Sequence, residues 1–376
     1  MGIPREATSA VLPAVALLAS VIGCREGTGP LPPVTGAEAG VYRYVGRVDS
    51  TTAPGEVHLV GVASYVEFGF SGDSVAVVVS SEGGPDGYSF ATVEIDGAYR
   101  GRFEIPEDEE TRLAFVVDAG AQAEPHRLRL SQASEQWVGA LRFLGASAKT
   151  LHPAPARRGR VSFFGDSISA GAASDTTGKS CDEEHYGDLA NGFLAFPARA
   201  ARLLDLDYVV HAQSGRGLYV NWNAEDPPLP ALLDHLSMDT SDARAYDLAT
   251  EDPILAVIAL GTNDISDGEA RAASPFDSSV YTMRYVGFAD RLAEAYPRAD
   301  FVLVTSPMTR GERGALLARS IARARDMIAE RHPSREVVIA DVTGMPNNGC
   351  SAVPHPTIDD QAAIAERVAT AAREVL

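Results

Sequence analysis

The chain has 376 residues, of which 45% are apolar, 22% charged and 7% aromatic, and at roughly 150 residues per domain this length suggests two domains. Its 51 acidic residues outnumber its 32 basic residues, which gives a formal net charge of -19, and no basic stripe interrupts this acidity. A surface of this sign repels polyanions, so the composition excludes a nucleic-acid partner. Three cysteines are too few for a disulfide-stapled miniprotein or a cysteine-rich zinc module.

The N-terminus is predicted to be a targeting segment. Its apolar run over 10–22 is too short to span a bilayer and has the length of a signal-peptide core. The run leads into Gly23 and Cys24, and the resulting sequence VIGC resembles the bacterial lipoprotein box, in which the cysteine is lipidated and the chain is cleaved before it. We therefore expect a signal peptide over 1–23 and a tether over 24–38. The alternative is an ordinary secretory signal with a chance cysteine.

The same segment predicts where the protein is found. Arg25 follows the expected lipidation site, where inner-membrane retention in enteric bacteria is associated with aspartate. We expect a lipid-anchored protein of the bacterial cell envelope, with the outer membrane favoured, or a secreted one if Cys24 carries no lipid. Cys181 and Cys350 would then lie in an oxidising compartment, either as a disulfide or as two buried free thiols.

A β-sandwich is predicted over 39–150. Short alternating segments rich in β-formers are separated by Gly, Pro and Asp every 8–15 residues, which is typical of an antiparallel, jelly-roll-like sandwich. Trp137 is expected in its core, and the segment 153–159 reads as the linker that leaves it. The strand candidates are 64–70, 74–80, 89–97, 112–118, 126–131 and 138–145.

An α/β domain is predicted over 158–376. Near-continuous apolar strands alternate here with helical stretches such as that around Leu317 and Ile321, and the last helix is expected from Ile358 to Val375. Strands of this kind are buried on both faces, which predicts a doubly wound parallel sheet whose working residues gather at the carboxyl ends of the strands. The strand candidates are 161–165, 207–212, 254–261, 301–306 and 336–342.

Polar residues and glycine follow the first two of these strands. Ser167 stands where strand 161–165 turns into a helix, a position that exposes its hydroxyl above the sheet and aims its own N–H at an oxyanion. A serine there is also typical of a helix N-cap. Gly215 follows the second strand and either brings a backbone N–H close to a ligand or forms an ordinary turn.

Two further groups complete the pattern. Asn263 follows the third strand and can donate its amide to a developing negative charge, although an Asx turn is the common role of asparagine in such a place. His355 lies in a proline-rich loop before the last helix, where a lone histidine is usually only solvated. Together the four loops offer a nucleophile, oxyanion donors and a base, which are the parts of an acyl-transfer site.

These motifs resemble a known superfamily. The segments GDSIS, SGRG and GTND and the late His355-Pro356 are similar to the four blocks of the SGNH (GDSL-type) hydrolases. The stretches 191–218, 288–308 and 349–357, preceded by a sandwich, resemble carbohydrate esterase family 2, the acetylxylan esterases and related polysaccharide deacetylases. The resemblance covers roughly 40–376 and is looser in the sandwich.

The resemblance implies a role for each residue. Ser167 would be the nucleophile and His355 its base, while the N–H groups of Ser167 and Gly215 and the amide of Asn263 would hold the oxyanion. Acetyl would leave as acetate after water hydrolyses the acyl-enzyme. No cofactor is implied, and no metal is required, because the chain has no HExxH motif and its eight histidines do not cluster.

One position departs from the superfamily pattern. SGNH enzymes usually carry an aspartate three residues before the histidine, and some members of this family carry it two before, whereas this chain has Ala352 and Val353 there. The resemblance therefore implies a Ser–His dyad, with a backbone carbonyl in place of the acid. Asp359 and Asp360 are close by, and we expect them to cap the last helix.

The expected substrate is an acetylated plant-type polysaccharide or oligosaccharide, with xylan, glucomannan or mannan as the candidate polymers. Tyr219 and Trp222 would form a sugar-stacking wall or pack under their loop. The sandwich would bind carbohydrate or shield one side of the cleft. Two alternatives stay open: another SGNH esterase acting on lipid esters, thioesters or peptidoglycan O-acetyl groups, and a non-catalytic glycan-binding lipoprotein.

Overall fold

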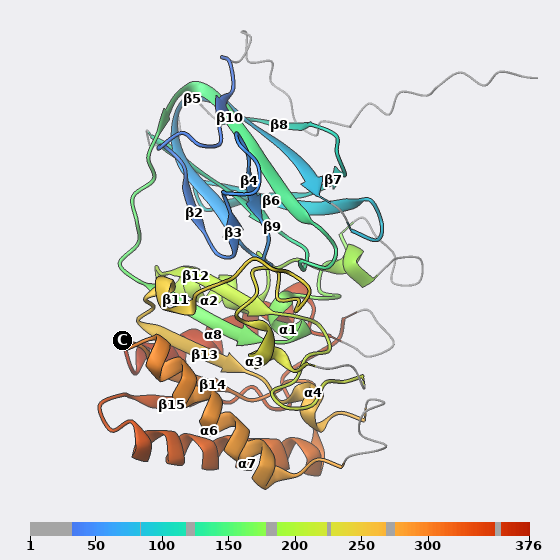
Figure 1. Cartoon of the computed structure of the whole chain (residues 1–376), viewed down its shortest axis with the longest axis vertical. Coiled ribbons are helices and arrows are strands. Elements are labelled where there is room, and N and C mark those ends of the chain that lie inside the picture. Colours follow the sequence, from blue (N-terminus) through green and yellow to red (C-terminus); the bar gives the residue numbers. More distant parts are fainter. Residues whose placement is uncertain are drawn as a thin grey trace, which may run out of the picture.

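A computed structural model of the chain describes residues 32–82, 84–117, 125–177, 186–223, 227–267, 275–349 and 355–376. An antiparallel β-structure sits on an α/β structure, and the two are stacked along the long axis of the molecule (Figure 1). This arrangement is the predicted fold class, an antiparallel β domain followed by a parallel-sheet α/β domain. No helix within these residues combines the length and the apolar character needed to cross a membrane.

The N-terminal half forms a ten-stranded sheet in which one long strand, β5, pairs with four other strands. The first half of β5 pairs with β2 and β9, and its second half pairs with β10 and β8. A strand that changes partners in this way joins the two layers of a sandwich. The strands are β1 (Thr35–Gly36), β2 (Arg43–Val45), β3 (Val48–Asp49), β4 (Val57–Leu59), β5 (Tyr65–Glu82), β6 (Tyr88–Ile95), β7 (Ala98–Pro106), β8 (Thr111–Val116), β9 (His126–Gln132) and β10 (Ala140–His152).

Alternating residues of β5 build the sandwich core. Val66, Phe68 and Phe70, and then Val75 and Val77, are fully buried in one apolar cluster, because every second side chain of a strand points to the same face. The strands predicted over 64–70 and 74–80 are therefore one continuous strand, and β7 was not predicted at all. Its pattern of exposed and half-buried residues lacks the apolar runs on which the prediction relied.

Two expectations about this half need correction. Trp137 is not in the core: it lies in the turn between β9 and β10, off the strands, and 39% of its surface is exposed. The tether predicted over 24–38 overlaps the fold at its end, since Thr35 and Gly36 pair with Ala146 and Gly145 of β10.

The C-terminal half is a five-stranded parallel sheet in the order β12-β11-β13-β14-β15. Its strands are β11 (Arg160–Gly165), β12 (Asp207–Ala212), β13 (Leu255–Ala259), β14 (Asp300–Val304) and β15 (Val337–Ala340). The helices are α1 (Ser167–Ala170), α2 (Phe196–Leu203), α3 (Leu229–Leu232), α4 (Thr262–Ile265), α6 (Ser278–Ala295), α7 (Gly311–Arg331) and α8 (Ile358–Arg373), and the 3-10 turns are η1 (Tyr186–Leu189) and η2 (Leu248–Glu251). Helix α8 ends two residues before the predicted Val375, as fraying helix ends commonly do.

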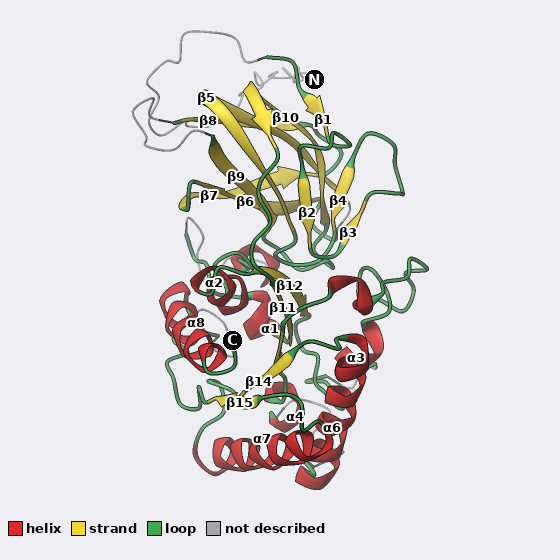
Figure 2. Cartoon of the chain, turned by 90° about the vertical axis from the view of Figure 1, so that its left-hand side faces the viewer, coloured by secondary structure: helices red, strands yellow, loops and turns green. Residues whose placement is uncertain are grey.

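Helices cover both faces of this sheet (Figure 2). Phe163 packs into the cluster that holds α2 and α8, while the next residue, Phe164, packs into the cluster that holds α6 and α7. The apolar positions Leu317 and Ile321 of α7 are buried in the second cluster, as their spacing predicts. Burial on both faces explains why these strands are apolar without alternation.

The pairing register aligns the carboxyl ends of β11, β12 and β13. Gly165, at the end of β11, pairs with Ala212 of β12 on one side and Ala259 of β13 on the other. The segments that follow these three strands therefore begin at the same edge of the sheet, which is where ligands bind in open α/β folds.

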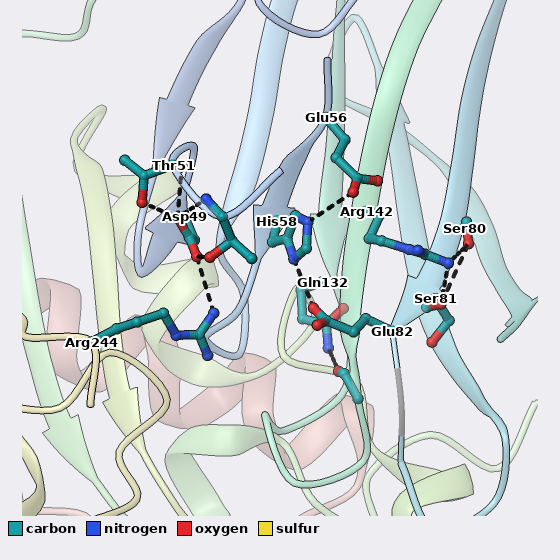
Figure 3. Close-up of polar contacts among 12 residues, drawn as sticks. Asp49, Thr51, Glu56, His58, Ser80, Ser81, Glu82, Gln132, Arg142 and Arg244 are labelled. Atoms are coloured by element: carbon teal, nitrogen blue, oxygen red, sulfur yellow. Dashed lines mark hydrogen bonds and ion pairs between the residues drawn. The ribbon is translucent and has the colours of Figure 1, made fainter. Parts of the chain in front are cut away.

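Buried polar contacts attach the sandwich to the α/β half. Arg47, fully buried, donates to His211 Nδ1 at 2.9 Å and to the carbonyl oxygens of Leu233 and His235 at 2.9 and 2.6 Å. Asp49 of β3 forms an ion pair with Arg244 at 3.0 Å (Figure 3). Because Arg47 is fully buried and binds three groups of the α/β half, its contacts hold the sandwich in one orientation over the sheet.

Candidate active site

Ser167 is the first residue of α1, directly beyond β11. Asp166 caps this helix, and its carboxylate accepts the N–H of Ile168 at 3.0 Å. The strand-to-helix turn is tight, since a Cβ at Gly165 would come within 1.9 Å of Ser169 Oγ. The turn holds Ser167 at the carboxyl edge of the sheet, with 6% of its surface exposed.

The side chain of His355 contacts the hydroxyl of Ser167. Its Nε2 is 2.8 Å from Ser167 Oγ, a hydrogen-bond distance at which a proton can pass between the two atoms. Helix α8 sets this position, because Gln361 donates to the carbonyl of Ile168 at 2.9 Å and accepts the N–H of Phe196 at 2.8 Å. The base and the nucleophile are therefore positioned by contacts between α8, α1 and α2.

The aspartates of α8 serve the helix rather than the histidine. Thr357 is the N-cap, and Asp360 completes a capping box by accepting the Thr357 N–H at 3.0 Å. Asp360 also accepts the N–H of Asn348 at 3.1 Å, and Asp359 is exposed in the first turn. The cap expected of Asp360 is thus present. Positions 352 and 353, where an acid was missing from the motif, lie outside the described residues.

The expected oxyanion donors meet around one loop, residues 213–222. Gly215 has a φ of +77°, a left-handed conformation that favours glycine. The amide Nδ2 of Asn263 donates to the carbonyl of Arg216 at 2.8 Å, and Asn263 is 7% exposed. An amide NH₂ has two N–H bonds, so it can hold this loop and donate to a ligand at once. The structure therefore brings Ser167, Gly215, Asn263 and His355 together at one edge of the sheet.

Two motif aspartates have structural tasks that the sequence did not reveal. Asp264 accepts the N–H groups of Leu218, Tyr219 and Val220 at 2.8, 2.9 and 3.1 Å, which fixes the far side of the 213–222 loop. Burial raises the pKa of Asp166 to about 7, against a smaller opposing effect of the hydrogen bond from Ile168. Asp166 belongs to the GDS motif and Asp264 to the GTND motif, so the motifs could have indicated that both aspartates matter.

Two other residues near the site had no sequence signal at all. Tyr186 places its hydroxyl 3.4 Å from His355 Nε2, and its ring meets the imidazole edge-on at 6.0 Å between centroids. Glu135, from the sandwich, hydrogen-bonds to Ser214 next to Gly215. Neither belongs to a recognisable motif, and Glu135 lies 79 positions before its partner.

The two aromatic candidates differ in their surroundings. Tyr219 is half-buried against Tyr281, with ring centroids 6.3 Å apart, and its hydroxyl accepts the N–H of Asp277 at 3.3 Å. Trp222 is 41% exposed and lines an open pocket of about 580 Å³ that also includes Thr262, the neighbour of Asn263. Trp222 therefore faces an open pocket beside the site, whereas Tyr219 packs under the loop.

Other predicted groups cannot be placed. Cys24, Cys181 and Cys350 lie outside the described residues, so lipidation and the disulfide stay predictions. Within the ranges that the structure describes, no three His, Cys, Asp or Glu side chains come together as metal ligands would.

Comparisons with known proteins agree with this geometry. The family model for the carbohydrate esterase 2 N-terminal domain matches residues 44–155, and that for the GDSL-like lipase/acylhydrolase family matches residues 163–374. The chain belongs to carbohydrate esterase family 2, within the GDSL-like hydrolases. Membership of this family makes it a carboxylic ester hydrolase. The resemblance noted in the sequence is therefore confirmed for both halves.

Individual relatives span most of this esterase. An acetylxylan esterase / glucomannan deacetylase of Cellvibrio japonicus is 27% identical over 333 residues, which cover 86% of this chain and 88% of the relative. The structure of a family two carbohydrate esterase from the same organism has a TM-score of 0.75 at 23% identity and covers 91% of this chain and 97% of its own. A family two carbohydrate esterase from Clostridium thermocellum, solved with cellohexaose, also has a TM-score of 0.75 at 23% identity, with 89% and 98% covered.

Proposed function

We propose that this protein is a carbohydrate O-acetyl esterase that removes acetyl groups from a polysaccharide such as xylan, glucomannan or mannan. The observation that carries the proposal is the 2.8 Å contact between Ser167 Oγ and His355 Nε2, at the carboxyl edge of a family-2 α/β domain. The names of the curated relatives support the acetyl group and the polymer class.

The chemistry follows from the positions of these atoms. His355 Nε2 takes the proton of Ser167 Oγ as this oxygen attacks the acetyl carbonyl carbon. The N–H groups of Ser167 and Gly215 and the Asn263 amide stabilise the resulting oxyanion. His355 then gives its proton to the departing sugar oxygen, which leaves an acetyl-serine. In the second half, His355 takes a proton from water as the water oxygen attacks the carbonyl carbon of the acetyl-serine. His355 then gives this proton to Ser167 Oγ as the acyl bond breaks, which restores the serine hydroxyl and releases acetic acid, which ionises to acetate.

Acetate release is the direct test. Acetylated xylan, acetylated glucomannan and 4-nitrophenyl acetate are offered side by side to the purified protein and to a Ser167→Ala variant. We expect turnover of a polymer that exceeds turnover of the simple ester and disappears in the variant. Turnover of the simple ester alone would contradict the polysaccharide assignment while leaving the esterase chemistry in place.

A fluorophosphonate label separates the enzyme from a glycan-binding protein with a degenerate site. Fluorophosphonates react only with an activated serine, so labelling that is lost in Ser167→Ala supports the proposed nucleophile. Absence of labelling in the wild type, together with no acetate release, would favour the binding protein.

We further propose that the signal peptide over 1–23 is removed and that Cys24 carries a lipid, which anchors the esterase to the cell envelope, on the outer membrane. The apolar run over 10–22 and the sequence VIGC support this. Metabolic labelling with a fatty-acid analogue tests it: the wild type should be labelled and Cys24→Ser should not. Equal labelling of both would refute the anchor.

A further inference from the structure

A loop of the sandwich reaches the site. Residues 133–139 connect β9 to β10, and the side-chain amide of Gln132 closes the base of this loop by donating to the carbonyl of Gly139. Figure 3 shows Gln132 among the polar residues of the sandwich. The carbonyl of Ala133 accepts the N–H of Gly192 from the α/β half at 2.8 Å. The loop is therefore fixed both within the sandwich and against the α/β domain.

Among the residues that the structure describes, Glu135 in this loop is buried with no cationic partner. Only 1% of its surface is exposed, and no ion pair to it is found in the part of the chain that the structure describes. Instead, Ser214 gives it two hydrogen bonds, one from its N–H to Oε2 at 2.6 Å and one from its hydroxyl to Oε1. Burial raises the pKa of Glu135, and the hydrogen bonds from Ser214 oppose this shift. A desolvated carboxylate held in this way is costly for stability, which points to a task beyond packing.

The position of Ser214 indicates that task. Its carbonyl and the N–H of Gly215 belong to the same peptide unit, and Glu135 holds the N–H and Oγ of Ser214, so Glu135 fixes the residue from which the Gly215 N–H projects. Asp264 fixes the far side of the loop, but it binds residues beyond Gly215. Within the α/β domain, the Trp222 N–H binds the Gly215 carbonyl and Asn263 binds the Arg216 carbonyl, and Glu135 adds a contact from the sandwich to the residue before Gly215.

A second contact extends this network to the reacting pair. Tyr186 lies between Ser214 and His355, with its hydroxyl 3.4 Å from Ser214 Oγ and 3.4 Å from His355 Nε2. The chain of groups thus runs from Glu135 through Ser214 and Tyr186 to the catalytic imidazole. It meets His355 at Nε2, whereas the acid of a Ser-His-Asp triad binds Nδ1. Glu135 is accordingly no substitute for the missing triad aspartate.

We propose that Glu135 is a positioning residue for ester hydrolysis: through Ser214 it aims the Gly215 N–H at the oxyanion, and through Tyr186 it orients His355. The sandwich is then a part of the active site rather than only a shield or a binding module. This inference rests on the proposed function of the same site.

Kinetics of three variants test the role. Glu135→Ala should lower kcat by 10- to 100-fold and change KM by less than about threefold, because a misdirected oxyanion donor weakens the transition state more than the ground state. Glu135→Gln should recover most of the lost kcat. Its amide oxygen can accept the Ser214 N–H, and its NH₂ can donate to the Ser214 hydroxyl, because a hydroxyl oxygen also accepts hydrogen bonds. Ser214→Ala should show a smaller loss, and the double variant with Glu135→Ala should be no slower than Glu135→Ala alone.

The matched control is Asp49→Ala. Asp49 is also a buried sandwich carboxylate that binds the α/β half, but its partner Arg244 lies outside the site (Figure 3). We expect this variant to melt at a lower temperature and to keep the wild-type kcat while folded. If Glu135→Ala does not fold, Ser214→Ala and Tyr186→Phe take its place, and both should lower kcat without raising KM.

The outcomes distinguish this inference from the proposed function. If the wild type releases no acetate from any ester, the proposed function fails. If the wild type is active and Glu135→Ala, or its replacements, keep kcat within about twofold, only the positioning role fails. Losses in Glu135→Ala and Ser214→Ala that multiply in the double variant would also overturn it, because residues acting through one contact are not independent.

Discussion

The amide of Asn263 offers the sharpest test of the proposed oxyanion hole. Its Nδ2 holds the Arg216 carbonyl at 2.8 Å, and the side chain is almost fully buried at the edge of the sheet. Removing one such donor typically costs about 2.7–4 kcal/mol of transition-state stabilisation, which is about 100- to 1000-fold in kcat. Losing the neutral hydrogen bond to Arg216 costs about 1 kcal/mol of folding stability. Asn263→Ala should therefore lose nearly all activity and little stability.

The assay measures kcat and KM for acetate release from 4-nitrophenyl acetate and from an acetylated polymer, together with thermal unfolding. We expect kcat to fall at least 100-fold in Asn263→Ala, KM to stay within about threefold, and the melting temperature to drop by a few degrees. Asn263→Asp keeps the size of the side chain but cannot donate, so it should lose at least as much. A loss of less than tenfold in kcat, or a rise in KM with kcat unchanged, would refute the assigned role.

Three further predictions concern stability and substrate binding. Burial raises the pKa of Asp166 to about 7 in the folded protein, so its contribution to stability falls as pH rises from about 4 to 7. Asp166→Asn should therefore gain stability over the wild type at pH 8 relative to pH 5, by about 2.6 kcal/mol in urea unfolding. A stability difference that does not depend on pH would contradict this. Arg47→Met removes the donor that binds His211 Nδ1 and two buried carbonyl oxygens, and should lower the free energy of unfolding by about 3 kcal/mol or more. A change below about 1 kcal/mol would show that the interface does not depend on Arg47. Trp222→Ala should raise KM for the polymer about tenfold, because a polymer is long enough to reach the pocket beside Thr262. The variant should leave kcat/KM for the small ester 4-nitrophenyl acetate within about twofold. An equal effect on both substrates would argue against a sugar contact.

Much of the α/β half could be predicted from the sequence, because its strands and motifs are marked by residues that are close together in the chain. Strands buried on both faces have continuous apolar runs, and each of the five predicted segments overlaps a strand of the parallel sheet to within two residues at either end. The four motif residues each follow a strand or precede a helix, and parallel strands end at one edge. That geometry predicts that Ser167, Gly215, Asn263 and His355 lie close together. In the structure Ser167 contacts His355, and Asn263 contacts Arg216 next to Gly215.

Weaker local signals explain the errors. The sequence of β5 predicts two segments because Ser71, Gly72 and Asp73 interrupt its apolar alternation. In the structure, β10 pairs with β5 on both sides of this interruption, across a register shift. Trp137 was expected in the core because large aromatic side chains usually bury most of their area, but burial of a turn residue depends on what packs over the turn.

The sequence by itself determined the two fold types, the strand-end motifs and the family. The spacing of apolar residues indicates the fold types, and short runs of neighbouring residues form the motifs that indicate the family. Only the tertiary structure decided that Glu135 and Tyr186 meet the site, and that Ser167 and His355, 188 positions apart, share a hydrogen bond. The physical reason is that docking of the sandwich on the sheet joins surfaces from distant parts of the chain. Such contacts depend on the shape and polarity of both surfaces at once, and no periodicity within either segment records them.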